Sequence, residues 1–198
     1  MKSADVKKYL IEQYPEFGHV IDKVDVLSID NSGKTSVADA VTQTIIGQML
    51  SKKVAQTIYK RVETARLKKN LKGAWNLSST ELGAQGVSGR KARSIIEFGQ
   101  IYDKNPEYYE SWRTLSYDEL KTVVTAQRGL STWSTDILAI FYFGLKDIFP
   151  EGDGTLKRAI KILNDDYYHQ SEFDPDKAKP YRTFLSLYLW RMIDDKLI

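Results

Sequence analysis

The feature that most constrains the fold is a short turn between two helical segments, Gln127-Arg128-Gly129-Leu130-Ser131-Thr132. Gly129 can adopt the left-handed backbone that lets two helices meet at a tight angle, and Ser131 can cap the second helix. A helix that begins at such a turn presents free backbone amides and its dipole to an anion. Taken alone, a helix–glycine–helix turn is most often structural, so it predicts a local fold before it predicts a ligand.

The remainder of the chain also follows a helical pattern. Apolar residues recur at helical spacing from Val37 to Leu50 and again from Val54 to Val62. The predicted helix starts are two capping boxes, Ser78-Ser79-Thr80-Glu81 and Ser116-Tyr117-Asp118-Glu119, the pair Asn105-Pro106, and Pro180.

The last predicted helix carries Leu185, Tyr188, Leu189 and Met192 on one face. The connection through Asn31-Ser32-Gly33 is predicted to be a turn, and the polar segment from Tyr167 to Lys179 a loop. Because no segment has a convincing strand pattern, the sequence predicts an all-α fold of roughly ten short helices.

Composition excludes several classes of site. The chain has 198 residues, which is the size of one domain, and it contains no cysteine. Disulfides, thiolate zinc sites and a cysteine-held iron–sulfur cluster are therefore excluded. The longest apolar run, from Ile137 to Leu145, is too short to cross a bilayer, and residues 1–5 are polar. We expect an intracellular protein without a membrane partner, in the cytoplasm or nucleoid of a prokaryote or the nucleus of a eukaryote.

The net charge of +3 permits a nucleic-acid partner without requiring one. A basic footprint has to come from clustered residues, and the candidates are Lys52-Lys53, Lys60-Arg61, Lys68-Lys69 and Arg90-Lys91-Arg93. Each of these groups also fits an ordinary solvated helix face.

A carboxylate between two glycines follows the second helix, in Pro150-Glu151-Gly152-Asp153-Gly154. Asp153 fits the N-cap of another helix. It also fits a carboxylate that stabilises an oxocarbenium-like sugar cation and activates a water. Trp133 and Trp190 are either core residues or flat faces on which an extruded base stacks, and a cationic base gains a further cation–π attraction there.

Five blocks, taken in order, resemble the helix–hairpin–helix DNA glycosylase superfamily, and within it the branch of 3-methyladenine DNA glycosylase II and the alkylpurine glycosylases. The resemblance covers roughly residues 35 to 195. The blocks are Ile45-Ile46-Gly47-Gln48-Met49-Leu50-Ser51, Gly86-Val87-Ser88 with Lys91-Ala92, Gly129-Leu130-Ser131-Thr132-Trp133-Ser134-Thr135, Ile148-Phe149-Pro150-Glu151-Gly152-Asp153, and Pro180-Tyr181-Arg182 with Tyr188-Leu189-Trp190-Arg191.

This resemblance implies a compact helical glycosylase fold with two helical lobes around a central cleft. It implies a single domain over residues 1–198, with the hairpin at about 117–144 and the catalytic segment at about 148–158. The expected partner is double-stranded DNA that contains damaged bases, and the protein is expected to be a monomer.

The resemblance also implies residue roles. Asp153 takes the place of the catalytic aspartate, and Trp133 and Trp190 take positions of base-pocket aromatics. Met49 stands where the family places an apolar wedge that fills the gap left by the extruded nucleotide, and Gln48 lies beside it, near the orphaned partner strand.

DNA contacts are further implied for Gly129, Ser131 and Lys91. Backbone carbonyls of Thr125, Gln127 and Leu130 match the positions that hold a monovalent cation, Na⁺ or K⁺, which would bridge to a DNA phosphate. No cofactor is expected to be required.

One position implies the reaction subtype. Bifunctional members of the family carry a nucleophilic lysine in the hairpin, and this chain has Trp133 there. The implied activity is that of a monofunctional glycosylase, which hydrolyses the N-glycosidic bond of alkylated purines of the 3-methyladenine and 7-methylguanine type in duplex DNA. An abasic site remains, as in the first step of base excision repair.

Two departures and two alternatives stay open. Ser131 replaces the second glycine of the hairpin, which puts DNA affinity and the ion site in question, and Asp136 adds a negative charge near the turn unless it points inward. The first alternative function is a non-catalytic DNA-binding or lesion-recognition module. The second is a glycosylase for uncharged lesions such as uracil or hypoxanthine.

Overall fold

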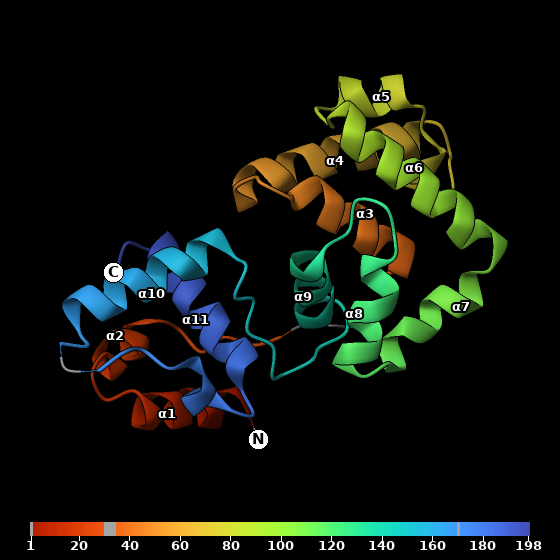
Figure 1. Cartoon of the computed structure of the whole chain (residues 1–198). Coiled ribbons are helices and arrows are strands. Elements are labelled where there is room, and N and C mark those ends of the chain that lie inside the picture. Colours follow the sequence, from red (N-terminus) through yellow and green to blue (C-terminus); the bar gives the residue numbers. More distant parts are fainter. Residues whose placement is uncertain (1, 30–34, 170) are drawn as a thin grey trace. The chain divides into compact units, whose positions relative to one another are not determined.

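The computed structural model describes residues 2–29, 35–169 and 171–198 (Figure 1). Over these ranges it contains eleven α-helices, three short 3₁₀ helices and no strand, which confirms the predicted all-α class. The chain divides into two compact units, Met1–Asp30 with Ala139–Ile198 and Asn31–Leu138. The turn predicted at Asn31-Ser32-Gly33 lies outside the described residues. In the described part, no helix is long and apolar enough to cross a membrane.

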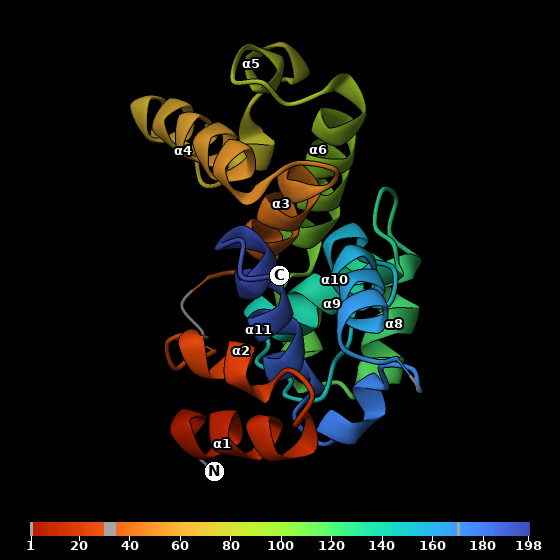
Figure 2. The same ribbon diagram turned by 90° about the vertical axis from the view of Figure 1, so that its left-hand side faces the viewer.

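The first unit is built from four helices, α1 (Ser3–Gln13), α2 (Gly18–Lys23), α10 (Gly154–Asp166) and α11 (Arg182–Asp194), with the 3₁₀ turn η3 (Pro175–Ala178) in the connection that was predicted to be a loop. Helices α10 and α11 pack against each other, as do α1 and α2 (Figures 1 and 2). The predicted apolar face of the last helix is confirmed, since Leu185, Tyr188, Leu189 and Met192 are fully buried.

The second unit contains the other elements, α3 (Val37–Gly47), α4 (Lys52–Lys68), η1 (Ala74–Asn76), α5 (Ser79–Ala84), α6 (Gly89–Lys104), α7 (Pro106–Glu110), η2 (Ser111–Thr114), α8 (Tyr117–Thr125) and α9 (Thr132–Phe141). Residues of α9 from Ala139 onward are counted with the first unit. Helix α6 packs against α3, η1 and α5. The apolar spacing at 54–62 correctly predicted a helix, but Val54 is 45% exposed and only Val62 of α4 is buried.

Three of the four predicted helix starts are confirmed by their hydrogen bonds. The fourth is shifted, because α11 begins at Arg182 with Tyr181 at its N-cap, so Pro180 lies before the helix. Ser78 and Ser116 each accept a backbone N–H from the third helical residue, and the glutamate at that position closes the capping box. The side chain of Asn105 caps α7, and Pro106 follows it at the first helical position.

Two helix–turn–helix elements in the second unit share one turn pattern. Gly86 lies between α5 and α6 with φ +100°, and Gly129 lies between α8 and α9 with φ +81°. A serine follows each glycine at the same spacing, Ser88 at the N-cap of α6 and Ser131 before α9. Both glycines therefore occupy left-handed backbone that other residues rarely adopt, as the hairpin sequence predicts.

Candidate active site and DNA-binding elements

Asp153 is held at the start of α10. One carboxylate oxygen, Oδ1, accepts the backbone N–H groups of Thr155 at 2.9 Å and Leu156 at 3.0 Å, so Asp153 is the N-cap of this helix. The same oxygen accepts the indole Nε1–H of Trp190 at 3.0 Å. Three donors from two helices thus fix the orientation of a carboxylate that is only half-buried.

Asp153 is flanked in the chain by two glycines, Gly152 and Gly154. A Cβ atom added at Gly152 or Gly154 would meet no heavy atom within 4 Å. Glycine is therefore not demanded by packing at either position. Because both flanking residues lack side chains, more space remains around Asp153.

The segment that leads to Asp153 is tied to α11. Arg182 binds Asp147 through two bonds, Nε to Oδ1 at 2.7 Å and Nη2 to Oδ2 at 3.0 Å. The hydroxyl of Thr183 donates to the carbonyl of Leu145 at 2.7 Å and accepts the N–H of Ile148 at 3.0 Å. Burial alone would raise the pKa of Asp147, but the hydrogen bonds from Arg182 outweigh it and lower that pKa. The block around Arg182 thus fixes the segment that leads to Asp153.

Trp190 has two contacts that its sequence position did not reveal. Besides donating to Asp153, its ring stacks on Phe141 with centroids 5.8 Å apart and planes 25° from parallel. Phe141 is 41% exposed, which is unusual for a large aromatic at the end of an apolar helix. Phe141 is not among the predicted site residues, and its signal in the sequence is the dense aromatic run Phe141-Tyr142-Phe143.

We expect Trp190→Phe to lower base release about tenfold or more, because it removes a hydrogen bond to a charged carboxylate while keeping an aromatic ring on Phe141. Initial rates on methylated duplex DNA measure this. The matched control is Trp75→Phe, since the Trp75 indole donates to Asp103 at 2.9 Å in the other unit. Equal rate losses in both variants would show that the indole bond to Asp153 has no special role.

The hairpin between α8 and α9 depends on Gly129. A Cβ at this position would lie 2.3 Å from Oγ and 2.8 Å from Cβ of Ser94 in α6, so the turn packs directly on that helix. Ser131 does not have a positive φ, so its backbone does not require the glycine that the family pattern carries there. Ser131 accepts the N–H of Ser134 through its hydroxyl at 3.4 Å and the N–H of Thr135 through its carbonyl at 3.0 Å.

Asp136 points into the protein, since it is only 3% exposed and accepts a hydrogen bond from the hydroxyl of Tyr117. Its charge is therefore not displayed at the turn. Trp133, the second residue of α9, is half-buried. Trp133 occupies the hairpin position where bifunctional members of the family carry a lysine. The role of Trp133 in a base pocket stays a prediction.

The carbonyls predicted to hold a cation lie at the hairpin. Thr125 is the last residue of α8, where carbonyls have no partner further along the helix. Gln127 and Leu130 flank the turn itself, and the carbonyl of Gln127 also accepts the N–H of Leu130 at 3.2 Å. Neutral carbonyl oxygens are suitable donors for Na⁺ or K⁺, so the residues present fit such an ion. Among the described residues, no cluster of three His, Cys, Asp or Glu side chains could hold a metal.

The loop between α3 and α4 carries the other predicted DNA contacts. Gln48 donates its side-chain amide to the carbonyl of Gly129 at 2.8 Å and to the hydroxyl of Ser134 at 3.2 Å. Met49 is fully exposed and has φ +57°. The Lys91 ammonium lies on backbone carbonyls at the end of α3, a placement that charge clustering did not predict.

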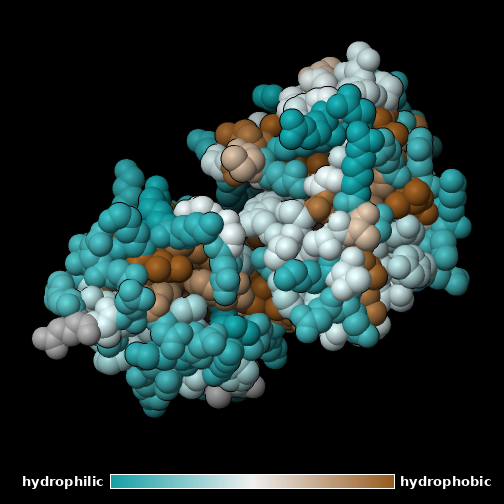
Figure 3. Space-filling model, viewed as in Figure 1, coloured by the Kyte–Doolittle hydropathy of each residue, from teal (hydrophilic) through white to brown (hydrophobic). Residues whose placement is uncertain are grey.

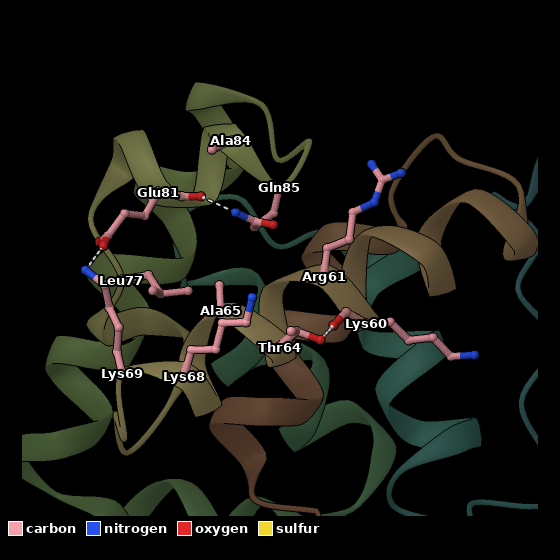
Figure 4. A pocket seen from close by; sticks show the side chains of 10 residues that line it. All are labelled: Lys60, Arg61, Thr64, Ala65, Lys68, Lys69, Leu77, Glu81, Ala84 and Gln85. Atoms are coloured by element: carbon pink, nitrogen blue, oxygen red, sulfur yellow. Dashed lines mark hydrogen bonds and ion pairs between the residues drawn. The ribbon is translucent and has the colours of Figure 1, made fainter.

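Two of the four predicted basic clusters, Lys60-Arg61 and Lys68-Lys69, line a groove between α4 and α5 (Figure 4). The groove has a volume of about 470 Å³ and is lined by Lys60, Arg61, Thr64, Ala65, Lys68, Lys69, Leu77, Glu81, Ala84 and Gln85. Lys69 forms an ion pair with Glu81, and the hydrogen bonds from Lys69 and Ser78 lower the pKa of Glu81 to about 2. None of the predicted site residues lines this groove, so it is not the candidate site.

No protein-family model matches the chain. Two curated relatives do match it. The alkylbase DNA glycosidase-like protein mag2 of Schizosaccharomyces pombe is 30% identical over 82 residues, covering 39% of this chain. YfjP of Bacillus subtilis, which carries the name of a DNA-3-methyladenine glycosylase, is 24% identical over 177 residues, covering 80% of this chain. The chain spans 38% and 60% of the lengths of these two relatives.

A solved structure shares the fold. The 3-methyladenine DNA glycosylase Mag1 of Schizosaccharomyces pombe, determined in complex with abasic DNA, superposes with a TM-score of 0.73. The alignment covers 96% of this chain and 97% of that one, at 16% identity. In sequence the chain is therefore similar to proteins that carry the names of alkylbase and 3-methyladenine DNA glycosylases, and it shares the fold of Mag1.

Proposed function

We propose that the chain is a monofunctional DNA glycosylase that removes alkylated purines, of the 3-methyladenine and 7-methylguanine type, from duplex DNA. The observation that carries the proposal is the Asp153 carboxylate, which is oriented by three donors, flanked by two glycines and backed by the Trp190–Phe141 stack. A fixed, half-buried carboxylate is suited to stabilise positive charge on a deoxyribose as the base leaves, and to orient the attacking water.

The same residues support the proposed substrate class. An alkylated purine of this type carries a positive charge, which weakens its glycosidic bond and makes it a good leaving group. Little acid catalysis is then needed, which suits a site built on one carboxylate. The exposed face of Phe141 and the ring of Trp190 offer aromatic surface on which a cationic base gains a cation–π attraction.

Strand cleavage is not part of the proposed reaction. A lyase step needs an amine nucleophile to form a Schiff base with the sugar, and Trp133 stands at the hairpin position where such a lysine would be. The reaction therefore ends at an abasic site with both strands intact. If a monovalent cation binds the carbonyls of Thr125, Gln127 and Leu130, it supplies positive charge for a DNA phosphate at the hairpin.

The test is base release from a lesion panel. Duplexes that carry a single 7-methylguanine, 3-methyladenine, uracil or hypoxanthine are incubated with the protein, and the free base and the integrity of the strand are both measured. We expect release of the methylated purines, with strand breaks only after hot alkali. Release of uracil or hypoxanthine alone would favour a glycosylase for uncharged lesions. Binding without any release would favour a non-catalytic module.

We expect Met49→Ala to reduce base release from duplex DNA about tenfold without reducing stability by more than about 0.5 kcal/mol, because the side chain is fully exposed and contributes no core packing. Exposed apolar surface is visible near the N-terminal end of α4 (Figure 3). The matched control is Leu67→Ala. It truncates an apolar side chain that is 63% exposed near the C-terminal end of α4, the helix that follows the Met49 loop. Wild-type rates for Met49→Ala would contradict the wedge role.

A further inference from the structure

The loop between α3 and α4, residues 48–51, holds an apolar side chain in water on strained backbone. Met49 combines full exposure with φ +57°, a conformation that costs a residue other than glycine about 1–2 kcal/mol. The side chain of Met49 is fully exposed, so it contributes no core packing that would offset this cost. Its conformation therefore has to be maintained by contacts of the neighbouring residues.

Two sets of hydrogen bonds hold the loop, one from each side. The amide of Gln48 donates to the carbonyl of Gly129 in the hairpin. The ammonium of Lys91, from the first turn of α6, donates to the carbonyls of Ile46 at 2.9 Å and Gln48 at 2.7 Å. These carbonyls belong to the C-terminal end of α3, where the helix dipole is negative and a cation is stabilised.

Lys91 is half-buried as well as hydrogen-bonded. Lys91, Ile46, Leu50, Ile58 and Val87 line one small hollow, so the aliphatic stem of the lysine runs among apolar side chains. The removal of water lowers the pKa of Lys91 from its ordinary value. A lysine that contacts DNA phosphates normally directs its ammonium toward solvent, whereas the Lys91 ammonium donates to two backbone carbonyls of its own chain.

We infer that Lys91 is a positioning residue: it fastens the end of α3 so that Met49 is presented in its exposed, strained conformation, and it does not bind a DNA phosphate. The inference rests on the proposed function only in that Met49 acts as the wedge. It assigns to Lys91 a role that the clustering of Arg90, Lys91 and Arg93 does not indicate.

The first test is the salt dependence of DNA affinity for Lys91→Met, which removes the ammonium and keeps the apolar stem. Each lost phosphate contact reduces the slope of log affinity against log salt by about 0.9. We expect the wild-type slope with an affinity that is lower at every salt concentration. Lys104→Met, which removes a lysine charge at the other end of α6, shows the effect of charge alone.

The second test needs neither DNA nor base release, so it separates this inference from the proposed function. The N–H of Leu50 donates to the carbonyl of Gly47 at 3.2 Å and reports whether the loop is closed. We expect hydrogen exchange at Leu50 to be about tenfold faster in Lys91→Met and unchanged in Lys104→Met. If Lys91→Met does not fold, Lys91→Gln serves the same comparison.

The third test couples Lys91 to Met49. Base extrusion is followed by the fluorescence of 2-aminopurine placed in a duplex, for Met49→Ala, Lys91→Met and the double variant. We expect the double variant to extrude the base no worse than Met49→Ala alone, because Lys91 acts through that side chain. Additive losses, unchanged exchange at Leu50, or a salt slope reduced by about one would each overturn the inference.

Discussion

Replacing Asp153 by asparagine is expected to lower the rate of base release by about 10²–10⁴-fold while leaving the fold and DNA binding in place. Asparagine is as good an N-cap as aspartate, so its side-chain oxygen can still accept the N–H groups of Thr155 and Leu156. What disappears is the negative charge that stabilises the developing sugar cation. Single-turnover rates on duplex DNA with one 7-methylguanine measure the loss.

Binding provides the complementary measurement for Asp153→Asn. DNA affinity is expected to be unchanged or higher, because a negative charge is removed from a surface that is proposed to meet phosphates. Asp174→Asn is the matched control, since Asp174 caps η3 through a bond to the N–H of Asp176 at 2.8 Å and lies outside the proposed site. Undiminished base release by Asp153→Asn would rule out the proposed mechanism, because base removal would then not depend on this carboxylate.

Local features of this chain were predictable from its sequence because they depend on residues within about one helical turn of each other. The boxes at Ser78 and Ser116, the left-handed glycine at position 129 and the N-cap at Asp153 all belong to this class. Each of these features can be predicted from the types of the side chains and their spacing alone. The structure confirms each of them with the hydrogen bonds or backbone angles that the pattern implies.

Features that depend on contacts between distant segments were not predictable. The indole of Trp190 reaches Asp153 across 37 residues of sequence, and Phe141 becomes half of an exposed stack only because α11 lies beside it. Lys91 belongs to a basic cluster by sequence. In the structure its ammonium donates to the carbonyls of Gln48 and Ile46, which are 43 and 45 residues away from Lys91 in the sequence. Neither hydrophobic periodicity nor the clustering of charges predicts which distant residue a side chain contacts.

Ser131 shows that a departure from a family pattern can be harmless for an identifiable reason. The pattern carries two glycines in the hairpin, but only Gly129 has a positive φ in this structure. A serine at position 131 is not strained, because its φ is not positive. Its hydroxyl and carbonyl accept hydrogen bonds from backbone N–H groups at the start of α9. The requirement for glycine at the turn is therefore concentrated in Gly129.

Gly129→Ala is accordingly expected to destabilise the protein by about 2–5 kcal/mol and to weaken DNA binding strongly. A left-handed φ costs alanine about 1–2 kcal/mol, and steric overlap with Ser94 adds about 1–3 kcal/mol. The methyl group would lie 2.8 Å from Cβ of Ser94, which no rotation of the serine side chain can relieve. Helix α6 or the hairpin then has to move. Denaturant unfolding and DNA titration measure the two effects.

Two further variants separate the backbone cost of Gly129→Ala from the steric cost. Gly86→Ala places alanine at φ +100°, where its methyl group would lie 3.4 Å from Ile58, an ordinary contact distance, so only the backbone cost of about 1–2 kcal/mol is expected. Adding Ser94→Gly to Gly129→Ala removes the overlap, so the double variant should be more stable than Gly129→Ala alone, despite the lower helix propensity of glycine. Equal losses for Gly86→Ala and Gly129→Ala would mean that the hairpin does not rest on α6, and the turn that is proposed to bind DNA would then have to be held in place by another contact.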